Sequence, residues 1–255
     1  MKLLRLVTFI FMVLTIGATP FDGLDIGGNM SIGRIFYILT MAFATISNCI
    51  FPRKMIAMEK PIMLLILWAM ITLLWSLDPD QTWYAIIFPV QSLFLVFVMI
   101  NLIDTRKKLY ITMGSWILGS LIICVMTILN FRTMSASAES IYRVNEYGNP
   151  NENSFILAYA LLFAMYIDRT KFRVLAVSML AICLYGIMSN GSRMGMILYT
   201  VLAASFIISL WQTGKKRYSI LLIPVLLGIG IYVFQNLPRA TILRFLNITN
   251  DIGNS

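Results

Sequence analysis

No histidine occurs in this chain of 255 residues. Catalysis by a histidine acid or base, and metal binding through imidazole, are therefore excluded for these residues. Cysteine is scarce as well: Cys49, Cys124 and Cys183 all fall inside apolar runs and lack the spacing of metal ligands. We interpret them as small apolar side chains within helices.

Charged residues are also scarce, at 12% of the chain against 59% hydrophobic residues. Ordinary soluble domains carry about 25% charged residues, and a chain of this length could not cover so much apolar surface in water. The net charge of +9 comes from short basic clusters between apolar runs. Such clusters are typical of cytoplasmic loops and not of a nucleic-acid-binding surface, so no nucleic-acid partner is expected.

The apolar runs predict an all-α, polytopic integral membrane protein, because a helix of about 20 apolar residues crosses the hydrocarbon core of a bilayer. About nine runs occur, at residues 3–19, 33–51, 61–77, 84–103, 109–129, 152–167, 174–189, 192–213 and 219–236. We expect one transmembrane domain over residues 1–255, with its longest polar loop at 130–151 and an external segment at 237–255. The first run could be a cleaved signal peptide, but Gly17-Ala18-Thr19-Pro20 is a poor cleavage site, which favours a retained helix.

The distribution of basic residues predicts the orientation of the helices. With the N-terminus in the cytoplasm, fourteen of the 20 Lys and Arg residues and three acidic residues face the cytoplasm. The other side then holds eight acidic residues and six arginines: Arg34, Arg132, Arg143, Arg193, Arg239 and Arg244. Since cytoplasmic loops are enriched in Lys and Arg, this pattern favours N-in, C-out. Arginine on the outer side suits phosphate or carboxylate, which its guanidinium binds through two parallel hydrogen bonds.

The first candidate site precedes the sixth predicted helix, on the outer side. It is the run 143–153, whose polar residues include Arg143, Asn145, Glu146, Asn149, Asn151, Glu152 and Asn153. Asn149 suits a helix N-cap, and Pro150 suits the first helical position. The free N–H groups and the dipole of this helix end favour a bound anion, and Arg143 could fold back over the same place.

The second candidate site is the turn Ser189-Asn190-Gly191-Ser192-Arg193 between the seventh and eighth helices. Asn-Gly predicts a tight turn, Ser192 suits an N-cap, and Arg193 then opposes the dipole of the helix that it begins. A bound anion would compensate that cation. The two sites together predict a binding place for a di-anionic group such as a lipid pyrophosphate. In the alternative interpretation, both arginines only mark the headgroup boundary, with their charged ends extended to water.

Other polar residues have weaker assignments. Glu146 and Glu152 could each act as a general base for an acceptor hydroxyl, or could pair with the neighbouring arginines. Asn48, Gln91, Ser92 and Asn101 lie in or near predicted helices, where amides most often form hydrogen bonds between helices.

The order of these motifs resembles that of the bacterial O-antigen ligase and O-antigen polymerase superfamily. Arg143 is followed by Gly148-Asn149-Pro150-Asn151 at the start of one helix, and Ser192-Arg193-Met194-Gly195 opens the next helix but one. Trp75-Ser76-Leu77-Asp78-Pro79 is similar to a further feature of that superfamily. The resemblance covers nearly the whole chain and is clearest over residues 130–210.

The resemblance implies a GT-C-like helical bundle in the bacterial cytoplasmic (inner) membrane, working without metal or other cofactor. Such glycosyltransferases transfer or polymerise a glycan from undecaprenyl diphosphate onto an acceptor glycan or lipid-linked sugar, outside the cytoplasm. The signature arginines of the superfamily match Arg143 and Arg193, which would be catalytic by binding the diphosphate. The expected substrate-binding residues are Asn149, Asn151, Ser192, Glu146 and Glu152.

Members of the superfamily usually continue into a large external loop and further helices, so the resemblance implies that this chain is truncated. Polymerase and ligase both stay open. Two other functions are alternatives. A transporter (flippase) of lipid-linked oligosaccharides is expected to show internal repeats and helices broken at mid-membrane. A non-catalytic membrane subunit would tolerate Arg143→Ala and Arg193→Ala.

Overall fold

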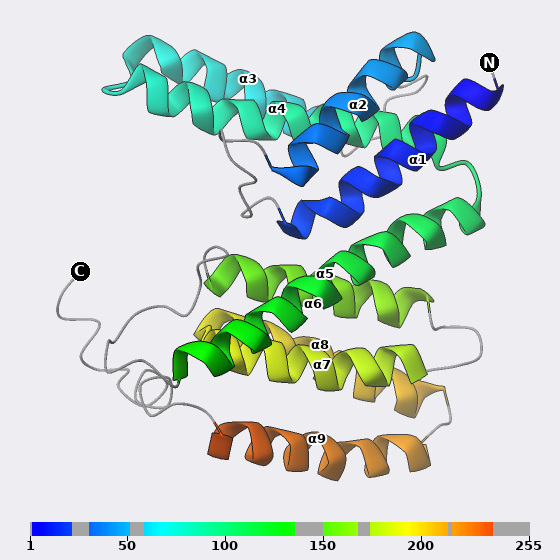
Figure 1. The fold of residues 1–255 in the computed structure, drawn as a ribbon, viewed down its shortest axis with the longest axis vertical. Coiled ribbons are helices and arrows are strands. Elements are labelled where there is room, and N and C mark those ends of the chain that lie inside the picture. Colours follow the sequence, from blue (N-terminus) through cyan, green and yellow to red (C-terminus); the bar gives the residue numbers. More distant parts are fainter. Residues whose placement is uncertain are drawn as a thin grey trace. The chain divides into compact units, whose positions relative to one another are not determined.

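The computed structural model describes residues 2–21, 31–51, 59–135, 150–167, 174–213 and 216–236. These residues form nine α-helices and two short 3-10 helices, without a β-strand in the described ranges (Figure 1). The α-helices are α1 (Lys2–Ala18), α2 (Ile32–Ile46), α3 (Glu59–Thr72), α4 (Pro79–Leu102), α5 (Arg106–Ser135), α6 (Pro150–Ile167), α7 (Val174–Asn190), α8 (Arg193–Gln212) and α9 (Lys216–Asn236). The 3-10 helices are Thr19–Phe21 and Leu73–Trp75. The predicted all-α class is confirmed.

Three helical segments are long and apolar enough to cross a membrane: Pro79–Leu102, Arg106–Met126 and Arg193–Gln212. Four further apolar helical segments are shorter: Ile32–Ile46, Lys60–Trp75, Val174–Ser189 and Leu222–Asn236. These are features of a membrane protein. Nine membrane crossings and the N-in, C-out orientation stay predictions.

The second predicted helix ends earlier than its apolar run, at Ile46 and not at residue 51. Asn48 adopts φ 53°, in the left-handed region. The N–H groups of Asn48 and Cys49 donate to the carbonyls of Thr45 and Ala44, at 3.1 and 2.9 Å. This is a Schellman motif, which ends a helix through backbone hydrogen bonds even where the sequence stays apolar.

The fourth and fifth predicted helices are longer than their apolar runs. α4 begins at Pro79 and not at residue 84, because Asp78 caps it: its Oδ1 accepts from the N–H of Gln81 at 3.0 Å. α5 continues to Ser135, so residues 130–135 belong to a helix and not to the predicted loop at 130–151. Hydropathy therefore located the helices but not the polar turns that extend them.

The chain divides into two compact units, Met1–Ile16 with Ile32–Ile111, and Gly17–Ser31 with Thr112–Ser255. In the first unit, α1 and α2 are joined by two hydroxyl pairs, Thr8 with Ser47 at 3.2 Å and Thr15 with Thr40 at 2.8 Å. Hydroxyl pairs of this kind join neighbouring helices in apolar surroundings. The single transmembrane domain over residues 1–255 stays a prediction.

Within the first unit, Asn101 joins α4 to the segment that follows α2. Its Nδ2 donates to the carbonyls of Cys49 and Phe51, both at 2.8 Å. These carbonyls follow the end of α2 and have no helical partner of their own. Asn101 therefore bonds to a non-helical segment, whereas the prediction for these amides was a hydrogen bond between helices.

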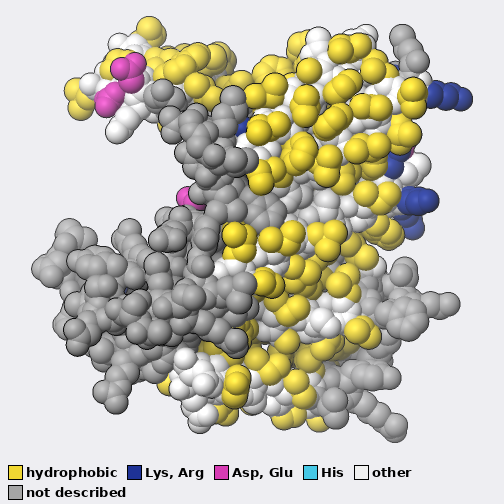
Figure 2. Space-filling model, in the orientation of Figure 1, with side chains coloured by type: hydrophobic (Ala, Val, Ile, Leu, Met, Phe, Trp, Pro, Cys, Tyr) yellow, Lys and Arg dark blue, Asp and Glu magenta, His cyan; other side chains and the backbone are white. Residues whose placement is uncertain are grey.

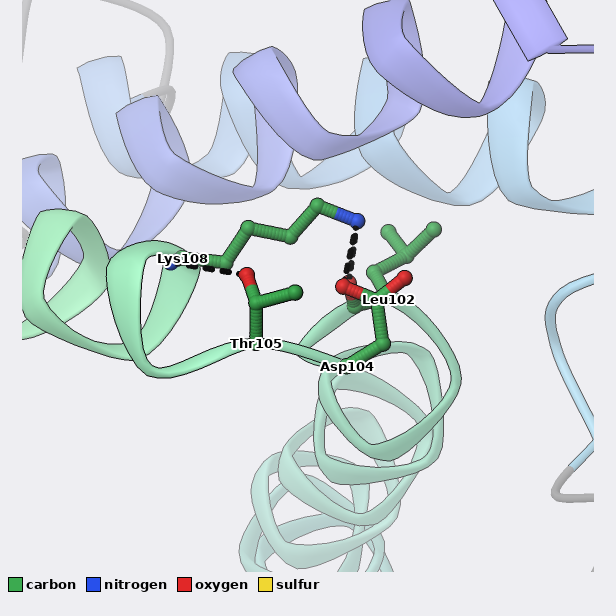
Figure 3. A network of polar contacts seen from close by, with 4 residues as sticks. All are labelled: Leu102, Asp104, Thr105 and Lys108. Carbon is green, nitrogen blue, oxygen red and sulfur yellow. Dashed lines mark hydrogen bonds and ion pairs between the residues drawn. The ribbon is translucent and has the colours of Figure 1, made fainter.

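A basic residue, Lys108, organises the junction between α4 and α5 (Figure 3). Its Nζ donates to the carbonyl of Leu102 at 3.0 Å and pairs with Asp104 Oδ1 at 2.8 Å. Its backbone N–H donates to Thr105 Oγ1 at 3.3 Å, which caps α5. The hydrogen bond from Lys108 lowers the pKa of the Asp104 carboxyl. The ammonium group of Lys108 therefore binds both a carbonyl at the end of α4 and a carboxylate in the turn before α5.

In the second unit, α7 packs against α6, α8 and α9, and α8 packs against α6 and α9 (Figure 1). The centre of this bundle is apolar and includes Leu157, Leu161, Leu180 and Ile187, each at most 1% exposed. The hydroxyl of Tyr199 donates to the carbonyl of Leu180 at 3.1 Å and so joins α8 to α7. The packing fixes the register of α6, α7 and α8.

On the face that Figure 2 shows, hydrophobic side chains cover much of the surface of the described residues. On and after α3, Leu64, Trp68 and Leu74 are 65%, 64% and 83% exposed. A soluble monomer rarely exposes contiguous apolar surface on this scale. The outer surface therefore suits contact with lipid.

Candidate functional site

The turn between α7 and α8 has the geometry that its sequence predicts. Gly191 adopts φ 65°, where a side chain would be strained, and its N–H donates to the carbonyl of Met188 at 3.0 Å. Ser192 then caps α8, since its Oγ accepts from the N–H of Gly195 at 3.0 Å. The predicted tight turn and the predicted N-cap are both confirmed. Arg193 is the first residue of α8.

Ser192 also joins the amino ends of α6 and α8. Its hydroxyl donates to Oδ1 of Asn151 at 2.8 Å, and Asn151 lies in the first turn of α6. Asn151 of the first predicted site and Ser192 of the second, 41 positions apart in the chain, are therefore in contact at one end of the second unit. Two helix amino ends side by side present several backbone N–H groups that have no carbonyl partner within their own helix.

A close contact one turn further along holds this arrangement. A Cβ added to Gly195 would lie 2.5 Å from Cβ and 2.7 Å from Oγ of Ser154, and 2.9 Å from Cγ2 of Ile187. No side chain fits there without displacing α6 or α7. Gly195 therefore sets the distance between α6 and α8, and with it the position of Arg193 two residues earlier.

Polar side chains continue below the helix ends into the bundle. Asn153, Ser154, Ser189 and Ser192 are at most 3% exposed. Among the described residues, Nδ2 of Asn153 and Oγ of Ser189 are buried without any hydrogen-bond partner. Sequence reasoning named Ser192 as a binding residue and placed Asn153 and Ser189 within the two candidate sites without giving them a role, and it missed Ser154. Their signal was present, since all three are polar residues inside otherwise apolar helices.

The charges around the helix ends favour an anion. Each helix amino end carries a partial charge of about +0.5, and Arg193 adds a full positive charge in the first turn of α8. Glu152 places a negative charge in the first turn of α6, where the helix dipole stabilises it and where it also repels a bound anion; its side chain is exposed. Arg193 is half-buried. A phosphate group placed here would meet backbone N–H groups, a guanidinium and the Ser192 cap.

Three predicted site residues, Arg143, Glu146 and Asn149, lie outside the described residues. Their proximity to Arg193 stays a prediction. The structure brings together Asn151, Ser192 and the first turns of both helices, which contain Glu152 and Arg193. The binding and catalytic roles of all these residues stay predictions.

No family model, curated protein or solved structure matches this chain.

Proposed function

We propose that this protein is a membrane glycosyltransferase of the O-antigen ligase or polymerase type. It uses a glycan linked to undecaprenyl diphosphate, on the non-cytoplasmic face of the bacterial cytoplasmic membrane, in surface-polysaccharide synthesis. The observation that supports this best is the hydrogen bond between Ser192 and Asn151, which joins two helix amino ends beside Arg193. Asn151 and Ser192-Arg193-Met194-Gly195, which belong to motifs that resemble the superfamily, lie at these same helix ends.

The proposed reaction is a glycosyl transfer without metal. The hydroxyl oxygen of the acceptor sugar attacks the anomeric carbon of the donor glycan, and its proton passes to a carboxylate, Glu146 or Glu152. The bond between the anomeric carbon and the diphosphate oxygen breaks, and its electron pair leaves with undecaprenyl diphosphate. Arg143, Arg193 and the amino ends of α6 and α8 stabilise the negative charge that develops on the leaving group.

The proposal also includes a topology: nine transmembrane helices in a GT-C-like bundle, N-in and C-out. In that topology the amino ends of α6 and α8 face the outer side, where the lipid-linked donor is presented. The charge pattern of the loops supports this orientation.

Complementation of a strain that lacks the gene tests the proposal. The full-length gene product would be compared with its Arg143→Ala, Arg193→Ala and Arg193→Lys variants, and surface polysaccharide would be resolved on gels. Both alanine variants should abolish function at normal membrane levels, and Arg193→Lys should restore little, because an ammonium cannot form two parallel hydrogen bonds. Arg34→Ala, on α2 in the other unit, is the matched control and should retain function.

The pattern on the gel also separates the two reaction types. Loss of long chains with short units still attached would assign a polymerase, and loss of all attachment would assign a ligase. Full function of both alanine variants would contradict the proposal. It would favour the alternatives, a lipid-linked oligosaccharide transporter or a non-catalytic subunit.

The transporter alternative has less support among the described helices. Helices broken near mid-membrane are common in transporters. Pro89 and Pro224 lie inside α4 and α9, yet each of these helices continues through its proline.

A further inference from the structure

The register of α6 and α7 places Asn153 and Ser189 at the same level of the second unit. Leu157 of α6 lies at the level of Cys183 and Gly186 of α7: its carbonyl accepts from Cys183 Sγ, and its side chain lies beside Gly186. One step toward the start of α6, Ser154 lies at the level of Ile187, since both contact the place of a Cβ on Gly195. The two helices are therefore antiparallel.

Asn153 lies one turn before Leu157 in α6, and Ser189 lies one turn after Gly186 in α7. Because the two helices are antiparallel, Asn153 and Ser189 lie at the same level. Both side chains are almost completely buried, at 3% and 2% exposed. Nδ2 of Asn153 and Oγ of Ser189 have no hydrogen-bond partner among the described residues. Ser189 also lies three positions before the α8 cap Ser192, so both atoms belong to the end of the bundle that carries the candidate site.

Unsatisfied buried donors are costly, and native proteins keep few of them without a functional reason. The amide of Asn153 offers two N–H donors and Ser189 offers one O–H donor. Donors in apolar surroundings bind a charged oxygen more strongly than donors in water do. The three donors therefore suit a phosphate oxygen that enters from the helix ends.

We propose that Asn153 and Ser189 bind the diphosphate of the lipid-linked donor directly, below Ser192 and Arg193. This inference rests on the proposed function and extends its binding site into the bundle by one helical turn. It assigns binding roles to two residues that lie within the two candidate motifs but had no role assigned there.

Lipid binding to the purified chain in nanodiscs tests the inference. The probes are undecaprenyl diphosphate, undecaprenol, which lacks the phosphates, and sodium pyrophosphate, which lacks the lipid. We expect the wild-type chain to bind undecaprenyl diphosphate and not undecaprenol. Ser189→Ala should weaken binding about tenfold, and Asn153→Asp, which puts a carboxylate in place of the amide, about a hundredfold. Ser178→Ala, exposed on the same helix α7, is the control and should bind as wild type does.

A second readout separates binding from a structural role. Without ligand, Ser189→Ala should have an unchanged or higher unfolding temperature, because it removes a buried group that lacks a partner. A lower unfolding temperature with unchanged lipid affinity would overturn the inference and assign Oγ to an internal water. Unchanged affinity in both variants would overturn it as well, while leaving the proposed function intact.

The probes identify the source of the bound phosphate. Competition by sodium pyrophosphate against bound undecaprenyl diphosphate would support recognition of the headgroup. Equal binding of undecaprenol would overturn the inference, since only the hydrocarbon chain would then be recognised. If sodium pyrophosphate bound and undecaprenyl diphosphate did not, the lipid would be overturned as the source of the bound phosphate. If the wild-type chain bound no lipid at all, the proposed function would be contradicted as well.

Discussion

Ser192 has three roles, two of them through its hydroxyl. It ends the turn at Gly191, caps α8 through the N–H of Gly195, and donates to Asn151 on α6. The first two roles were predictable because they depend only on neighbouring residues. The third was not, since it depends on how α6 and α8 pack.

Replacing Ser192 by alanine should destabilise the ligand-free protein by about 1–2 kcal/mol, because both the cap and the bond to Asn151 are lost. The free energy of unfolding in detergent micelles measures this. Ser205→Ala is the control: this exposed serine of α8 bonds only within its own helix, to the carbonyl of Val201 at 2.8 Å. It should change stability by less than about 0.5 kcal/mol. An equal loss in both variants would contradict the role of Ser192 between the helices.

The common level of the buried residues Asn153 and Ser189 could not be predicted from the sequence. Each is polar inside an apolar helix, but nothing in the sequence states that the two lie at the same level. That information comes from the register of α6 and α7, which Leu157, Cys183 and Gly186 establish. Arg193 was singled out by the charge pattern of the loops and by its motif, and its place in the first turn of α8 is confirmed.

At the scale of elements, the sequence predicted each α-helix but misplaced several ends. Apolar composition shows which segments avoid water, whereas the ends of a helix are set by local backbone conformation and by capping hydrogen bonds. α2 stops inside an apolar run because Asn48 adopts a left-handed conformation, and α4 starts in a polar turn because Asp78 caps it. Neither effect changes hydropathy.

The contact between α6 and α8 gives a prediction at this scale. Gly195→Ala should destabilise the second unit by about 1–3 kcal/mol, because the added Cβ would overlap Ser154 on α6. Gly114→Ala on α5 is the matched control, since a Cβ there meets nothing within 4 Å. The control should be neutral or stabilising by up to about 1 kcal/mol. Thermal unfolding of both variants measures the difference, and equal unfolding temperatures would show that α6 and α8 do not approach as described.

At the scale of the whole molecule, the proposed topology places the two ends of α4 on opposite sides of the membrane. The 24 residues of this helix span about 36 Å, slightly more than the hydrocarbon core. Asp80 lies in its first turn, and Lys107 follows the helix in the first turn of α5. Both side chains are exposed, so both positions are accessible to a reagent.

Labelling with a membrane-impermeant maleimide tests this topology. In intact cells, Asp80→Cys should react, whereas Lys107→Cys should react only after the membrane is permeabilised. Background should be low, because Cys49, Cys124 and Cys183 are all buried. The reverse pattern would invert the orientation and move the candidate site to the cytoplasmic face, where the proposed chemistry does not take place.

The most direct test of the central claim is the fate of the lipid-linked donor. The full-length gene product would be reconstituted in liposomes with a glycan linked to undecaprenyl diphosphate and an acceptor glycan. Our account predicts release of free undecaprenyl diphosphate together with a longer or newly attached glycan, and loss of both products in Arg193→Ala. A donor that stays intact, or that crosses the bilayer unchanged, would contradict a glycosyltransferase.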